Sequence, residues 1–122
     1  MPRPDDEIFS FIGSSFRSVW ALELLLLLKS ERRAWTQADL VATLRGSELV
    51  VSHALDGLVA AGLVSVDGQG ASYTPANDGL SKCVERVEEL YRTRPNAVRR
   101  TIIAASASSA TAFADAFKLR KD

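Results

Sequence analysis

Apolar residues recur at helical spacing over most of the chain, and short runs of Gly, Ser and Pro separate the helical segments. This pattern predicts a mainly α-helical protein, with helices over Asp5 to Ile12, Phe16 to Ser30, Gln37 to Arg45, Ser47 to Ala61, a segment capped by Asn77 or Asp78 that reaches Pro95, and the residues from Asn96 onward. The last segment is either helical throughout or a helix to about residue 105 followed by a mobile tail. Leucines cover more than one face of the second helix, which predicts a central helix packed on two neighbours.

Short apolar runs around a Gly-Gln-Gly turn at 68–70 predict the β structure. Leu63 to Asp67 and Ala71 to Thr74 flank this turn, so we expect them to pair as two short strands. Ala34 to Thr36 is a third, shorter candidate strand. We therefore expect one domain over residues 1–122, with a core at 15–76 and C-terminal helices at 77–122.

Composition and charge narrow the function classes. The 122 residues suit one domain with a single core. Because 15 basic and 15 acidic residues balance to a formal charge of +0, a nucleic-acid site would have to come from local clustering. The longest apolar run is well short of the roughly 20 residues of a membrane helix, and the acidic N-terminus does not look like a signal peptide. We expect a cytoplasmic protein without membrane contact.

Catalytic and metal chemistry have little support in the sequence. Cys83 and His53 are the chain's single cysteine and single histidine, too few for a zinc site. The sequence also lacks a Gly-rich phosphate loop and a recognisable nucleophile motif. We therefore expect no enzymatic activity, cofactor or metal.

From Thr36 to Leu80 the chain resembles the MarR-like winged helix-turn-helix transcription regulators. Three stretches carry this resemblance: TQADLVATLRGS, SELVVSHALDGLVAAGLV and YTPANDGL. It implies a winged helix-turn-helix, mainly α with a small β-wing, in which the helix after Ser47 enters the DNA major groove. We also expect a homodimer through the leucine-rich helix and the C-terminal helices, because apolar helices that flank a small core need a surface on which to bury their faces.

The side chains at the implied DNA surface are unsuited to DNA. Residues 46–81 contain no Lys or Arg, and four carboxylates give them a local formal charge of −4: Glu48, Asp56, Asp67 and Asp78. Base reading favours Arg, Lys, Asn or Gln, and phosphate binding needs cations that displace counterions. An acidic surface of this kind repels a polyanion.

Eight residues are candidate DNA contacts because the resemblance places them on the helix-turn-helix, beside it or on the wing: Arg32, Arg33, Thr36, Arg45, Ser47, Ser52, His53 and Gln69. The arginines are expected at phosphates, although arginines at helix ends are also common surface residues. Helix N-termini attract anions, but capping explains Thr36 and Ser47 and is the favoured interpretation. For His53 the favoured interpretation is a solvated surface side chain.

Five residues are candidates for a protein interface: Glu48, Leu49, Val50, Phe113 and Phe117. Leu49 and Val50 are apolar where the resemblance implies an exposed helix face, which is typical of a binding surface. A shifted helix that buries one of them explains the pattern equally well. Phe113 and Phe117 precede a basic stretch and fit a short docking helix, although packing on the first helix or on a second subunit is favoured.

Two functional hypotheses follow. The first is a dimeric transcription regulator with weak or atypical contact to duplex DNA, through phosphates beside the helix-turn-helix. The alternative is a winged-helix interaction module that no longer binds DNA. It uses the apolar, acidic helix after Ser47, the third helix of the winged-helix core, to bind a regulatory protein. The fold resemblance favours the first hypothesis, which we place narrowly ahead, and the residues themselves favour the second.

Overall fold

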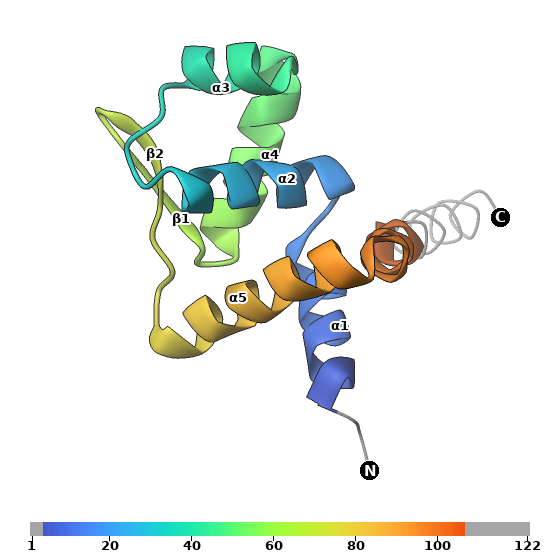
Figure 1. The fold of residues 1–122 in the computed structure, drawn as a ribbon. Helices are drawn as coiled ribbons and strands as arrows, with labels where there is room; N and C mark the ends of the chain where they lie inside the picture. The colour runs from blue at the N-terminus through green and yellow to red at the C-terminus, as the bar shows by residue number, and fades with distance from the viewer. Residues whose placement is uncertain (1–3, 107–122) are drawn as a thin grey trace, which may run out of the picture.

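The computed structural model describes residues 4–106 (Figure 1). Its elements follow one another in this order: α1 (Pro4–Ser15), α2 (Val19–Ser30), α3 (Gln37–Leu44), α4 (Glu48–Ala60), β1 (Val64–Asp67), β2 (Gly70–Tyr73) and α5 (Asp78–Thr93). Residues 95–106 are also helical. The prediction of a mainly α-helical chain with a small antiparallel sheet is confirmed.

Polar side chains cap the starts of four helices. Ser18, Thr36, Ser47 and Asn77 precede α2, α3, α4 and α5, and each side-chain oxygen accepts a hydrogen bond from the backbone N–H three residues later. These bonds satisfy donors that a helix cannot pair within its own first turn. The favoured interpretation of Thr36 and Ser47 as caps is confirmed.

The core forms around α2, which contacts α4 and β2 (Figure 1). Five of its residues are buried: Ala21, Leu22, Leu24, Leu25 and Leu28. The prediction of a central helix is therefore confirmed. Because these leucines are covered within one chain, α2 does not need a second subunit to bury them, and the homodimer stays a prediction.

The boundary between the first two helices differs from the expected one. The chain was expected to leave the first helix at Gly13, but α1 continues to Ser15, and α2 begins at Val19 instead of Phe16. A Cβ on Gly13 would lie 3.5 Å from the Ala105 Cβ, so this glycine lies where the segment 95–106 packs closely.

Among residues 4–106 no single helix is long and apolar enough to cross a membrane. α1 and α2 reach that length and composition only as a pair, with a 100° bend between them.

The hairpin is fastened to the loop between α2 and α3. β1 and β2 pair antiparallel with Val64 opposite Tyr73, and Trp35 forms an isolated bridge with Ala71 through two backbone hydrogen bonds of 2.8 Å. The expected third strand is thus a single bridge. Gly70 has a φ of +130°, and a Cβ there would collide with the Trp35 carbonyl, so only glycine fits this close approach.

Candidate functional site

The start of α4 is held in place by two polar contacts. The Ser47 Oγ accepts from the Val50 N–H at 3.2 Å, and the Gln37 Nε2 of α3 donates to the Glu48 carbonyl at 3.0 Å. Below this first turn, Val51, Leu55 and Leu58 are buried in the core, as expected. These contacts fix the rotation of α4 and so determine which side chains it exposes.

Leu49 and Val50 both point away from the core. Their exposed fractions are 65% and 44%, so the expectation that a shifted helix buries one of them is wrong. An α-helix turns by roughly 100° per residue. Because Val51 points into the core, Val50 and Leu49 before it point in other directions. Together with Glu48 and His53, which are also exposed, they form the surface that we call the α4 face: Glu48, Leu49, Val50 and His53.

A groove of about 250 Å³ runs beside the α4 face, between α4 and the connection from α1 to α2. We call it the α2-side groove. Val50, His53 and Gly57 line it from α4, and Arg17 and Ala21 line it from the other wall. Its wall is therefore mostly apolar, with one imidazole and one guanidinium at its edges.

A second groove, of about 450 Å³, lies between α4 and the hairpin, and we call it the hairpin-side groove. Val59 and Val66 line it, and their exposed fractions of 44% and 56% make them the other large apolar side chains exposed in this part of the chain. The sequence reasoning missed both valines. The stretch from Leu58 to Val66 is apolar except for Gly62 and Ser65. It holds more apolar side chains than one helix face and one strand face can bury, and that excess was the available signal.

The electrostatic character of α4 is acidic. Glu48 and Asp56 are exposed, and within residues 4–106 neither makes an ion pair. The cation next to α4 is Arg17, whose Cδ and Nε lie 3.8 Å from the position that a Cβ would take on Gly57. The α4 face thus combines apolar side chains with uncompensated negative charge.

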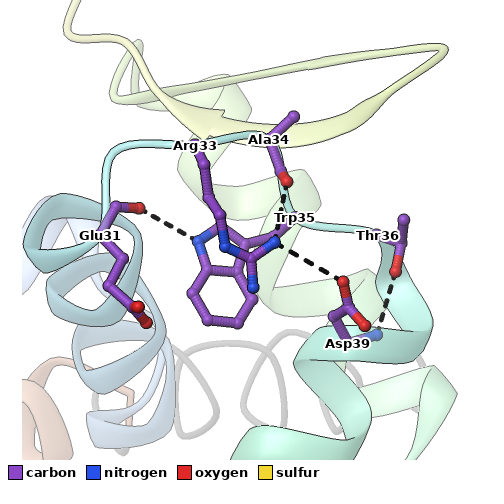
Figure 2. A network of polar contacts seen from close by, with 6 residues as sticks. All are labelled: Glu31, Arg33, Ala34, Trp35, Thr36 and Asp39. Atoms are coloured by element: carbon purple, nitrogen blue, oxygen red, sulfur yellow. Dashed lines mark hydrogen bonds and ion pairs between the residues drawn. The ribbon is translucent and has the colours of Figure 1, made fainter.

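Two of the three arginines expected at phosphates, Arg32 and Arg33, are held against the protein itself. Figure 2 shows the Arg33 guanidinium over the Trp35 ring, 3.7 Å from its centroid, donating to the Ala34 carbonyl at 3.2 Å and paired with Asp39 at 3.6 Å. The Trp35 Nε1 in turn donates to the Glu31 carbonyl at 3.1 Å. Arg32 lies over the Tyr73 ring at 5.3 Å. These contacts brace the loop before α3 against the hairpin.

The remaining DNA candidates are dispersed. Arg45 is exposed at the end of α3, where its φ of 55° places it in the left-handed region. Ser52 lines the hairpin-side groove and His53 the α2-side groove, so they lie on different sides of α4. At the hairpin tip the Gln69 N–H donates to the Asp67 carboxylate at 2.8 Å. The structure does not bring these side chains together into one polar surface.

The protein-interface candidates on α4, Glu48, Leu49 and Val50, are successive exposed residues of its first turn, whereas Phe113 and Phe117 are outside the described residues. Sequence reasoning also missed Arg17, because nothing in the pattern places the connection between α1 and α2 beside α4.

Comparisons of the chain with known protein families, with curated proteins and with solved structures find no match.

Proposed function

We propose that this chain is a winged-helix protein of the MarR-like type that acts in transcriptional control by binding a protein through its α4 face. The order of α2, the Trp35 bridge, α3, α4 and the β1–β2 hairpin supports a winged helix, with the hairpin as the wing. The resemblance between Thr36 and Leu80 supports the link to transcription. The mode of action is argued from the surface of α4.

One observation carries the proposal: Leu49 and Val50 are both exposed on a helix whose exposed charges are carboxylates. Exposed apolar side chains next to a groove are typical of a surface that a partner covers. DNA binding needs the opposite character, with cations toward phosphates and polar donors toward base edges. The partner chemistry that fits this surface is an amphipathic helix with apolar anchors and cations along its edge.

Contact with duplex DNA through Arg33 and Arg45 is the rival function. The discriminating measurement is fluorescence anisotropy of the purified protein on a mixed-sequence duplex at low salt, titrated upward in salt. We expect no binding. Binding that collapses as salt rises, and that Arg33→Ala with Arg45→Ala weakens, would overturn the proposal in favour of a phosphate clamp.

The protein-binding surface is tested with a matched pair of variants. Leu49→Glu introduces a charge into the α4 face, and Ile103→Glu does the same on the segment 95–106, where the side chain is 60% exposed. We expect the wild type and Ile103→Glu to retain a cellular protein that Leu49→Glu loses. Circular dichroism should show that both variants are folded. Equal retention by Leu49→Glu would show that α4 is not the docking surface.

A further inference from the structure

The two edges of the hairpin differ. The outer edge of β2 is bridged by Trp35, whose backbone exchanges two hydrogen bonds of 2.8 Å with Ala71. Within residues 4–106 no strand lies along the outer edge of β1, because the sheet has the order β1-β2. β1 contains no lysine, proline or bulge, which are devices that keep other chains from pairing with an exposed edge. The β1 edge is therefore where an extended chain can join the sheet.

The register of the hairpin determines which groups this edge presents. In an antiparallel pair, residues whose backbone bonds the partner strand alternate with residues whose N–H and C=O point outward. The Thr74 N–H donates to the Leu63 carbonyl at 3.0 Å, which makes these two a bonded pair. Val64 and Val66 are therefore the outward residues of β1, and no backbone hydrogen bond from outside the hairpin reaches them within residues 4–106. Ala71, opposite Val66, follows the same alternation, because its own backbone groups bond outward on the β2 side.

The hairpin-side groove lies next to this edge. Val64 and Val66 are two residues apart, so their side chains share one face of the sheet. The Val64 side chain is buried, whereas Val66 is 56% exposed and lines the groove together with residues of α4. A strand added to β1 would place alternate side chains on the same face, against the exposed valines at 59 and 66. Edge and groove thus form one surface, which we call the β1-edge site: Asp56, Val59, Val64 and Val66.

The charges around this site favour a basic occupant. Asp56 makes no ion pair within residues 4–106, and residues 46–81 have four carboxylates and no Lys or Arg. Arg32 lies over the Tyr73 ring of β2 and Arg33 over the bridging tryptophan, so these cations are held at β2 and its bridge. Pairing of β1 with β1 of a second copy would bring two sets of carboxylates together, which like-charge repulsion disfavours. A segment that carries lysine or arginine complements the site instead.

We infer that the β1-edge site binds an extended segment of a protein partner, which joins the sheet as an added strand and carries alternating apolar side chains and at least one cation. Main-chain hydrogen bonds to Val64 and Val66 hold the segment, and its apolar side chains lie against Val59 and Val66. Its cation pairs with Asp56. This site goes beyond the proposed function, because it lies on the hairpin side of α4 and does not include the α4 face.

The test is a titration of the isotope-labelled, full-length chain, followed through its amide signals in NMR. The probe is the synthetic peptide acetyl-Thr-Arg-Thr-Val-Thr-Val-Thr-Arg-Thr-amide, whose valines and arginines fall on one face of a strand. It reads the same in both directions, so it fits a parallel or an antiparallel addition. We expect saturating shifts centred on Val64 and Val66. No shift at these amides with about 1 mM peptide would overturn the inference.

A proline at the edge removes one donor without touching the hairpin ladder. Val66→Pro deletes an outward N–H that β2 does not use, and an edge strand tolerates proline at such a position. It should weaken probe binding at least about tenfold, because a peptide carbonyl loses its donor and meets the proline ring. Val66→Thr keeps the N–H and the β-branched shape and should weaken binding less than about threefold. Equal affinities of the two variants, with the signals of the hairpin intact, would overturn the inference.

The charge of the occupant is tested at Asp56, where a substitution leaves the backbone of β1 unchanged. Asp56→Asn should weaken probe binding about threefold at low salt, and the difference should vanish at high salt. Glu85→Gln is the matched change at an exposed carboxylate of α5, outside the groove, and should have no effect. An unchanged affinity in Asp56→Asn, or an equal loss in Glu85→Gln, would overturn the placement of the peptide in this groove.

Dilution of the peptide-free chain tests whether a second copy occupies the β1 edge. The Val64 and Val66 signals should stay constant on dilution. Shifts that change with protein concentration at these two amides would overturn the inference in favour of self-pairing.

Failure of this inference and failure of the proposed function give different results. A protein whose capture depends on Leu49, without probe binding at Val66, would reject the β1-edge site and keep the α4 face. Probe binding that depends on Val66, without a protein whose capture depends on Leu49, would reject the proposed function and keep the β1-edge site.

Discussion

α2 and α4 are two apolar helices of nearly equal length, 12 and 13 residues, and both start at a serine cap. α2 buries five residues and exposes no large apolar side chain, whereas α4 buries three and exposes Leu49, Val50 and Val59. Both helices have several neighbours: α2 contacts α4 and β2 and is tied to α5, and α4 contacts α2, α3 and β1. α4 has more apolar side chains than these neighbours cover, which indicates that its exposed side is a binding surface.

The largest expected effect comes from comparing substitutions at two leucines of α4, one buried and one exposed. Leu58 is fully buried and Leu49 is 65% exposed. Leu58→Ala leaves a cavity and should lower the free energy of unfolding by roughly 2–5 kcal/mol. Leu49→Ala should change it by no more than about 0.5 kcal/mol. Urea unfolding followed by circular dichroism measures both, and an equal cost would mean that Leu49 is covered in solution.

The contact between α2 and the turn before α4 provides the next test. A Cβ on Gly46 would lie 2.5 Å from the Trp20 ring of α2, which packs on the core. Gly46→Ala should therefore cost about 1–3 kcal/mol, because the ring has to move. Gly68→Ala is the control, since nothing lies within 4 Å of that position, and its change should stay within about 0.5 kcal/mol. Similar unfolding midpoints for the two variants would show that Trp20 does not fix the start of α4.

Much of this architecture could be predicted from local patterns. Caps at Thr36, Ser47 and Asn77, and the inward set Val51, Leu55 and Leu58, follow from short-range sequence alone, and the structure has them as expected. Such features are decided within one helical turn, where residue type and spacing carry the information.

The errors in the prediction arose where distant segments meet. Gly13 reads as a helix break, yet it stays within α1, where it packs beside residue 105. For the candidate site, the sequence left open whether Leu49 or Val50 was buried, because both are apolar and the rotation of α4 depends on its neighbours. Arg33 was expected at phosphates, and its stacking on Trp35 and pairing with Asp39 depend on the fold of the loop before α3.

The two serine caps should contribute equally, although the helices differ in burial. The Ser18 Oγ accepts from the Ala21 N–H at 3.1 Å, and the Ser47 Oγ accepts from the Val50 N–H at 3.2 Å. Ser18→Ala and Ser47→Ala should each cost about 1 kcal/mol in thermal or urea unfolding. Ser52→Ala, within α4, is the control and should cost nothing because alanine favours the helix. A neutral Ser47→Ala beside a costly Ser18→Ala would mean that the first turn of α4 is frayed and the α4 face is not preformed.

The smallest expected effect comes from charge. The Lys29 Nζ of α2 lies 2.8 Å from the Glu88 Oε1 of α5, and the Lys29 side chain is only 16% exposed. Glu88→Gln should therefore cost about 0.5–1 kcal/mol, less at high salt. Asp56→Asn is the matched change on α4 and should cost less than about 0.5 kcal/mol, because Asp56 makes no ion pair within residues 4–106. A salt-sensitive cost at Asp56 would mean that a cation already neutralises α4 in solution.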